Sequence, residues 1–172
     1  MNSIQSYVVA LTQDLKEILP QSFVPPSSGA KSRTEMVIAK SLVENSPGYI
    51  ESVVMQINGS YENGWYDCCA VMIRRLLETL IIEVFEHHKI ASKIKDTTTG
   101  DFFYLSGLIQ QTLEESAWNL GRNTKKAMPA LKNVGDLSAH SRRYNAHRSD
   151  IDNIILPLRV VVQELVYLAG LK

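Results

Sequence analysis

The longest stretch with helical periodicity, residues 65–88, is the feature that most constrains the fold. Its apolar side chains recur every four residues in two adjacent rows, which together cover a broad face of one helix. The first row is Cys69, Ile73, Leu77, Ile81 and Phe85, and the second is Met72, Leu76, Leu80 and Val84. A helix with so wide an apolar face must be buried on most sides, so we expect it at the centre of a helical bundle.

Two adjacent arginines, Arg74 and Arg75, interrupt this apolar stretch about halfway along it. They can be read as solvated side chains paired with Glu78, which follows three or four residues later. They can also be read as a pair of cations that faces an anion, which would make them nucleotide-binding residues. The sequence leaves both interpretations open.

Segments on both sides of the central stretch also repeat apolar residues at helical spacing, and none alternates convincingly as a half-buried strand would. The expected helices lie at 3–19, from Ser32 to about 45, at 49–57 with a pattern that can continue into the central helix, at 101–117, at 128–140 and from Ser149 onward. The fold class is therefore all-α, a bundle of four to five main helices with an N-terminal helical appendage. Because residues 20–31 read as a proline-rich linker, we place the appendage at 1–45 and the bundle at 46–172.

Prolines and glycines give more local expectations. Pro129 is expected in the first turn of its helix, where a missing N–H is tolerated. Pro157 either kinks the last helix or begins a new helix in its first turn. Gly135 permits close approach of its backbone to a neighbouring helix. Asn58-Gly59 and Asn63-Gly64 both have the composition of turns.

Composition and charge restrict the class of protein. The chain has 172 residues, 45% hydrophobic and 21% charged, which is ordinary for one globular domain with a short appendage. Eighteen basic residues balance eighteen acidic ones, so any site for a polyanion must be a local cluster. No apolar run reaches the roughly 18–20 residues of a membrane span, and the N-terminus lacks the basic start of a signal peptide. We therefore expect a cytoplasmic protein without a membrane partner.

The cysteines and histidines give no sign of a metal or cofactor. Cys68 and Cys69 are adjacent, which excludes a relaxed disulfide between them, and both read as small buried apolar residues. His87 and His88 end a helix and lack the i, i+4 spacing of metal ligands on one helix face. No glycine-rich phosphate loop is present either, so neither a metal nor a cofactor is expected.

The side chains that could carry chemistry gather between residues 132 and 150. This stretch contains two histidines, three arginines, two asparagines and two aspartates beside two expected helix ends. Arginine forks match phosphate oxygens, and helix N-termini present free amides, so such a cluster could hold a phosphate. The alternative interpretation is an interhelical loop that is polar because it is solvated.

Two motifs resemble the HEPN superfamily (higher eukaryotes and prokaryotes nucleotide-binding). Residues 70–78, AVMIRRLLE, are similar to the A-V-x-x-R-x-x-L-E helix of an uncharacterised bacterial branch, and residues 135–140, GDLSAH, to its G-N/D-x-x-A-H element. The resemblance covers about residues 47–170. It implies a dimeric helical bundle that binds RNA or nucleotides, and many members are metal-independent ribonucleases of toxin or anti-phage systems.

The resemblance also suggests site residues. The ribonucleases of the superfamily carry an arginine, then a polar residue, with a histidine four to six residues beyond the arginine. If His140 is that histidine, the arginine position falls near Gly135 and Asp136, where a carboxylate would repel phosphate. Residues 142–147 fit the pattern with Arg142 and His147. The candidate catalytic residues are therefore Arg142, His147 and His140, and the candidate nucleotide-binding residues are Arg74, Arg75, Asp136, Ser138, Arg143 and Asn145.

Three hypotheses follow from these patterns. The first is a non-catalytic HEPN-like module that binds RNA or nucleotide phosphate through residues 135–148, as a homodimer, in a phage-defence or prophage setting. The second is a metal-independent endoribonuclease that uses Arg142 and His147, or His140. The third is a protein-interaction or regulatory helical subunit, which the neutral net charge and the N-terminal helices outside the resemblance would suit.

Overall fold

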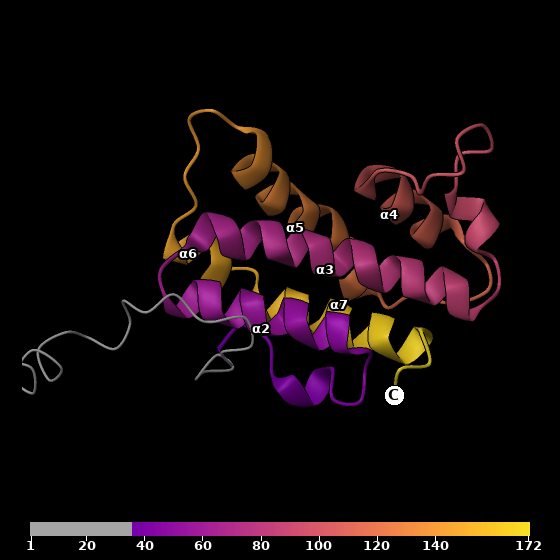
Figure 1. Cartoon of the computed structure of the whole chain (residues 1–172), viewed down its shortest axis with the longest axis horizontal. Helices are drawn as coiled ribbons and strands as arrows, with labels where there is room; N and C mark the ends of the chain where they lie inside the picture. The colour runs from indigo at the N-terminus through magenta and orange to yellow at the C-terminus, as the bar shows by residue number, and fades with distance from the viewer. Residues whose placement is uncertain (1–35) are drawn as a thin grey trace, which may run out of the picture. The chain divides into compact units, whose positions relative to one another are not determined.

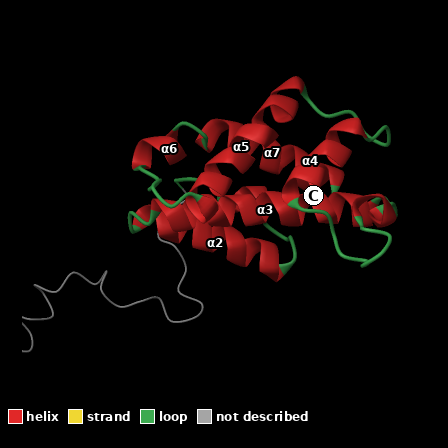
Figure 2. Cartoon of the chain, turned by 90° about the horizontal axis from the view of Figure 1, so that it is seen from above, coloured by secondary structure: helices red, strands yellow, loops and turns green. Residues whose placement is uncertain are grey.

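The computed structural model describes residues 36–172, which contain helices and loops but no strand. Figure 2 shows these helices in red. The one β-type contact in the described residues is an isolated antiparallel bridge between Lys95 and Phe102, which both lie outside the helices. In chain order the elements are η2 (Lys40–Leu42), α2 (Gly48–Glu62), α3 (Tyr66–His87), η3 (Ala91–Ile94), α4 (Leu105–Glu114), α5 (Arg122–His140), α6 (Arg148–Asp152) and α7 (Ile155–Leu168). The all-α fold class is confirmed for this part of the chain. The helix expected at 3–19, the linker at 20–31 and the start of a helix at Ser32 lie outside the described residues.

Helix α3 lies at the centre of the bundle, as the apolar rows predict. It contacts α2, α4, α5 and α7, and Figure 1 shows it running between α2 and α5. Every residue of the first row is buried, and so are Leu76, Leu80 and Val84 of the second, while Met72 is half-buried. The prediction that both cysteines are buried is wrong for Cys68, which is exposed. Cys69 lies on the apolar row and its neighbour does not, because successive helical residues point in different directions.

The contact between α3 and α5 depends on a glycine. A Cβ added at Gly135 would lie 2.6 Å from the Cβ of Arg74 and 3.1 Å from the backbone oxygen of Ala70. Neither atom is the far end of a flexible side chain, so only a residue without a Cβ fits at this crossing. The predicted close approach at Gly135 is confirmed.

Helices α2 and α3 are separate, and the break between them is local. Asn58 and Gly59 remain helical, whereas α2 ends at Glu62 and Gly64 adopts a left-handed conformation with φ of 75°. The Asn63 side-chain amide donates to the Gly59 oxygen at 2.8 Å, which satisfies one carbonyl of the last turn. Of the two turn signals in the sequence, the second therefore ends the helix.

The helix expected to run from Ser32 to about residue 45 is not found in its described part, where η2 is the only helical segment before α2. Side chains from distant helices take the backbone groups that a helix would pair. The buried Asn58 side chain accepts from the N–H groups of Val37 and Ile38 at 3.1 and 3.0 Å and donates to the Ile38 oxygen at 2.8 Å. Arg159 of α7 donates to the Val37 oxygen at 2.8 Å. Val37 and Ile38 are thereby held in the bundle core.

Helix α5 begins at Arg122, well before the expected start at Met128, so Pro129 lies in its interior and not in its first turn. The early start has a tertiary cause: Glu164 of α7 accepts a hydrogen bond from the N–H of Gly121 at 2.6 Å. A carboxylate at this end also complements the helix dipole. The proline leaves the carbonyl of Lys125 without its usual intrahelical donor, but Lys125 is exposed to water.

Two other helix boundaries differ from expectation. Helix α4 begins at Leu105 and not near 101, because the N–H of Phe103 donates to the Ile94 oxygen at 2.9 Å and keeps the preceding residues extended beside η3. The helix expected from Ser149 is divided into α6 and α7, and Pro157 lies in the first turn of α7. Of the two alternatives for Pro157, the structure confirms a new helix with the proline in its first turn, and not a kink within one continuous helix.

Replacing Gly135 by alanine should lower the free energy of unfolding by about 2 kcal/mol, because the new methyl group overlaps Arg74 and the α3 backbone. The matched control is Gly59→Ala in α2, where a Cβ would meet nothing within 4 Å. That substitution should raise stability by about 0.5–1 kcal/mol through helix propensity. Urea unfolding of both variants measures the two effects, and equal shifts would contradict the packing argument.

Candidate functional site

The candidate site is the segment that joins α5 to α6, which leaves the end of α5 and returns to the bundle at α6 (Figure 1). Together with His140, the last residue of α5, it presents Arg142, Arg143, Asn145 and His147, and all five are exposed. We call these five residues the basic loop. They come together because they are neighbours in the chain, and the geometry of the loop depends on how its backbone is held.

The backbone at the C-terminal end of the basic loop is held by two carboxylates. The N–H of Ala146 donates to Asp67, in the first turn of α3, at 3.0 Å, and Ala146 is buried. The N–H of His147 donates to Asp150 at 2.8 Å. This backbone hydrogen bond is the main reason why the pKa of Asp150 lies below its usual range. Both acids therefore act on backbone amides and leave the basic side chains of the loop exposed.

Helix α6 is fixed to the end of α2 by a second set of contacts. The Tyr61 hydroxyl donates to Asp152, and Arg148 Nε donates to the same hydroxyl oxygen at 3.1 Å. The Arg148 guanidinium also lies 5.6 Å from the centre of the Tyr61 ring. Burial, followed by the hydrogen bond to Asp152, raises the pKa of Tyr61. Arg148 is thus used to attach α6, although it follows the basic loop directly in the sequence.

Other basic side chains of the loop are not used in this way. The side chains of His140, Arg142 and Arg143 make no hydrogen bond or ion pair with any residue in 36–172. Cations that are exposed and unpaired on a fixed backbone are available to an external anion, and each arginine can give a phosphate two parallel hydrogen bonds.

The remaining candidate residues lie apart from the loop, at the contact between α3 and α5. Arg74 Nε pairs with Asp136 Oδ1 at 2.8 Å, and Lys132 binds the other oxygen of Asp136. Arg74 also lies 3.5 Å from Glu78, as the solvated interpretation of the two arginines expects. Arg75 is exposed on the neighbouring strip of α3. Arg74 and Arg75 therefore do not form one pair of anion ligands, since Arg74 already forms ion pairs with two carboxylates.

Asp136 is an ionised partner in this cluster and not an isolated negative charge. Burial alone would raise its pKa, but the hydrogen bonds from Lys132 and Arg74 outweigh that effect and lower the pKa below the usual range. Ser138, two residues further along α5, has a buried hydroxyl oxygen without a hydrogen-bond partner in the described residues. The residue as a whole is half-buried.

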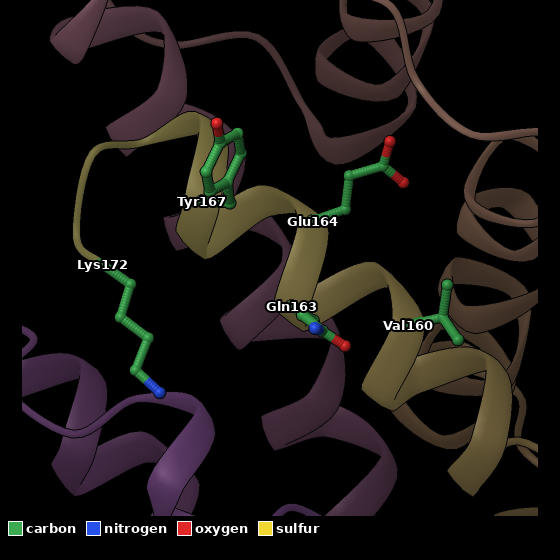
Figure 3. Close-up of a pocket in the computed structure, with 5 residues that line it drawn as sticks. All are labelled: Val160, Gln163, Glu164, Tyr167 and Lys172. Atoms are coloured by element: carbon green, nitrogen blue, oxygen red, sulfur yellow. The ribbon is translucent and has the colours of Figure 1, made fainter.

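The hollows of the surface lie elsewhere. One of about 430 Å³ lies between α4 and α5, lined by Ile109, Leu113 and Pro129 among others. Another of about 400 Å³ lies on α7 (Figure 3). Neither of these two hollows includes a residue of the basic loop. Within residues 36–172 no three His, Cys, Asp or Glu side chains are grouped as metal ligands, and none of the helices has the length and apolar character needed to cross a bilayer.

Sequence reasoning found the basic loop but missed what holds it. Asp67 and Tyr61 are distant from the loop in the chain, and no local pattern connects either residue with it. Comparison of the chain with models of protein families, with curated proteins and with solved structures finds no match.

The ion pairs of Asp136 should make stability depend on pH. Because its folded pKa is depressed, the carboxylate contributes stability above the unfolded value of about 3.9 and loses it as the pH falls through the folded value. We expect Asp136→Asn to cost about 1 kcal/mol near pH 7 and nothing near pH 2, where both proteins are protonated or neutral at this position. Urea midpoints across this range test the prediction, and a constant difference at every pH would contradict it.

Proposed function

We propose that this chain is a non-catalytic, HEPN-like module that binds RNA or nucleotide phosphate through the basic loop, and that it acts as a homodimer in a phage-defence or prophage setting. The observation that carries the proposal is the exposure of the His140, Arg142 and Arg143 side chains without partners among the described residues. They lie in a segment that is attached shortly afterwards, where Asp67 and Asp150 accept from the N–H groups of Ala146 and His147. The homodimer and the biological setting come from the superfamily resemblance.

The shape of the site favours a strand of RNA over a free nucleotide. Small molecules usually bind in clefts that bury most of their surface. The basic loop lies outside both described hollows, so a mononucleotide would touch few side chains there. A strand can instead place successive phosphates along an exposed row of cations.

The absence of catalysis is inferred from Asp136. A ribonuclease needs a cation where negative charge develops on the phosphoryl group, and the position one turn before His140 carries a carboxylate. Arg74 and Lys132 neutralise that carboxylate but are themselves occupied by it. The cluster therefore offers no unshared positive charge to a phosphate beside His140.

The double variant Arg142→Ala/Arg143→Ala should bind single-stranded RNA at least tenfold more weakly at low salt. The slope of log affinity against log salt concentration should fall by about 0.7 for each phosphate that the variant no longer neutralises. Fluorescence anisotropy with a labelled oligonucleotide measures both quantities. The matched control is Lys125→Ala/Lys126→Ala, which removes the same charge from exposed positions at the other end of α5. Equal weakening in the two variants would show that net charge, and not the basic loop, determines binding.

A ribonuclease is the second candidate, and the exposure of Arg142 together with both histidines favours it. A histidine could move the proton of a 2′-hydroxyl while an arginine stabilises charge on the phosphorus, without a metal. Our proposal expects no cleavage of an RNA ladder incubated with the protein in chelator. Cleavage that disappears in His147→Ala or His140→Ala, with the fold intact, would establish the ribonuclease and identify its histidine.

A protein-interaction or regulatory role is the remaining alternative. If the protein neither cleaves RNA nor binds it in a salt-sensitive manner in these assays, the exposed loop would be left as a surface for a protein partner. That outcome would contradict the RNA-binding proposal.

A further inference from the structure

Helix α7 has an apolar stripe on the side that faces away from the core. Leu158, Val161, Val162, Leu165 and Val166 form its buried face. On the opposite face Leu156, Val160 and Tyr167 are 73%, 42% and 73% exposed, and Gln163 completes the row. Single exposed apolar residues are normal, but three on one stripe of a helix indicate a contact surface.

The spacing of the stripe is that of a coiled-coil seam. The steps from Leu156 to Val160, Gln163 and Tyr167 are four, three and four residues, which is the alternation of d and a positions. Leu156 at a d position and the β-branched Val160 at an a position favour a two-stranded parallel arrangement. The stripe therefore suits a second copy of the same helix.

The surface of α7 also contains the socket that such a partner needs. The hollow of about 400 Å³ is lined by Val160, Gln163, Glu164 and Tyr167, and by Lys172 from the chain end. Figure 3 shows the first four on successive turns of α7. Residues at i, i+3, i+4 and i+7 are the four that surround a knob in knobs-into-holes packing. In a parallel pair, a seam residue of each helix can enter the hole of the other.

Charges on the two flanks of the stripe agree with this orientation. Arg159 takes a g position and Glu164 the following e position, so a parallel partner brings each arginine near the other copy's glutamate. Both side chains are already held within their own chain, by Val37 and by Gly121 respectively. Their positions beside the seam are therefore fixed before a partner arrives, although each shares its charge with a backbone group.

We propose that the outer stripe of α7 (Leu156, Val160, Gln163 and Tyr167) is the interface between two copies of this chain, packed in parallel about a two-fold axis along the helix. This inference rests on the proposed function only in its homodimeric state, since it names the surface and the orientation. A helix of 14 residues is about 21 Å long, so the seam alone is short and the dimer should dissociate on dilution through the micromolar range.

Parallel packing has a consequence for the basic loop. Helix α7 begins at Ile155, just after α6 ends at Asp152, so the loop lies toward the N-terminal end of α7. Two copies packed in parallel would place both loops at the same end of the dimer, where one strand of RNA could reach both. An antiparallel pair would place them at opposite ends.

Sedimentation velocity of the full chain over a range of concentrations tests the surface. Tyr167→Glu should shift the monomer–dimer equilibrium toward monomer by at least tenfold. The matched control, Tyr104→Glu, alters a tyrosine that is 87% exposed at the start of α4 and should leave the equilibrium unchanged. Thermal unfolding verifies that both variants are folded. A chain that is monomeric at every concentration, or a dimer that Tyr167→Glu does not weaken, would overturn the proposal.

Disulfide trapping tests the orientation. In a Cys68→Ser background, which removes the exposed native thiol, Leu156→Cys should give a covalent dimer on mild oxidation, because the two copies of this d position face each other in a parallel pair. In an antiparallel pair Leu156 would face the other end of the stripe, and its two copies would lie roughly 16 Å apart along the helix axis. Tyr104→Cys is the control and should not cross-link. A dimer that fails to cross-link through position 156 would refute the parallel arrangement.

The two proposals can fail separately. Binding of an RNA too short to span two loops should be the same for Tyr167→Glu and the unaltered chain. Loss of dimerisation with this binding retained supports the interface and the RNA site together. If the unaltered chain dimerises through α7 but binds no RNA, the interface stands and the proposed function falls.

Discussion

The close contact of α3 and α5 at Gly135 is the constraint on which the candidate site depends. Because this residue has no Cβ, the α5 backbone can approach Ala70 and the base of the Arg74 side chain. That approach lets Arg74 reach Asp136, the next residue of α5. The pair fixes the last turns of α5, and the basic loop begins where those turns end. A bundle with a wider spacing here would have no defined starting point for the loop.

A chain without net charge can still present a local surface of one sign, and the basic loop shows how. The nearby acids are not removed but are turned toward backbone amides and toward Tyr61. Each satisfies a polar group that would otherwise be costly to bury, which is how carboxylates stabilise turns and helix starts. The side chains of Arg142 and Arg143 form no such contact within the described residues and remain in solvent. The sign of the exposed surface therefore depends on which charged side chains form contacts within the chain and which remain in solvent.

The parts of this structure that could be predicted from the sequence are those fixed by local pattern. The apolar rows of α3 predict that it is buried, Gly64 predicts the break before it, and Pro157 predicts the start of α7. The position of Gly135 in a small-residue contact could likewise be anticipated. The first three depend on residues within a few turns of one another, so periodicity and backbone preference are sufficient. For Gly135 the residue type indicates a close approach, but its partners Ala70 and Arg74 lie far away in the chain.

The errors arose where a distant side chain decides local structure. Residues 37–38 have a helical pattern, but Asn58 and Arg159 take their backbone groups, and no pattern within the segment reveals this. The early start of α5 depends on Glu164 in the same way. For the candidate site, composition revealed the basic loop, whereas its attachment through Asp67 and Tyr61 could be seen only in the folded chain.

Glu164 joins two parts of the molecule that are far apart in sequence. One of its oxygens caps the start of α5, and the same side chain lines the hollow on α7. Anything that binds at the hollow and draws this carboxylate away must also release the N–H of Gly121, at the cost of one charge-assisted hydrogen bond. Occupation of the hollow and fraying of the first turn of α5 are then linked equilibria with a shared coupling free energy, and by reciprocity each biases the other.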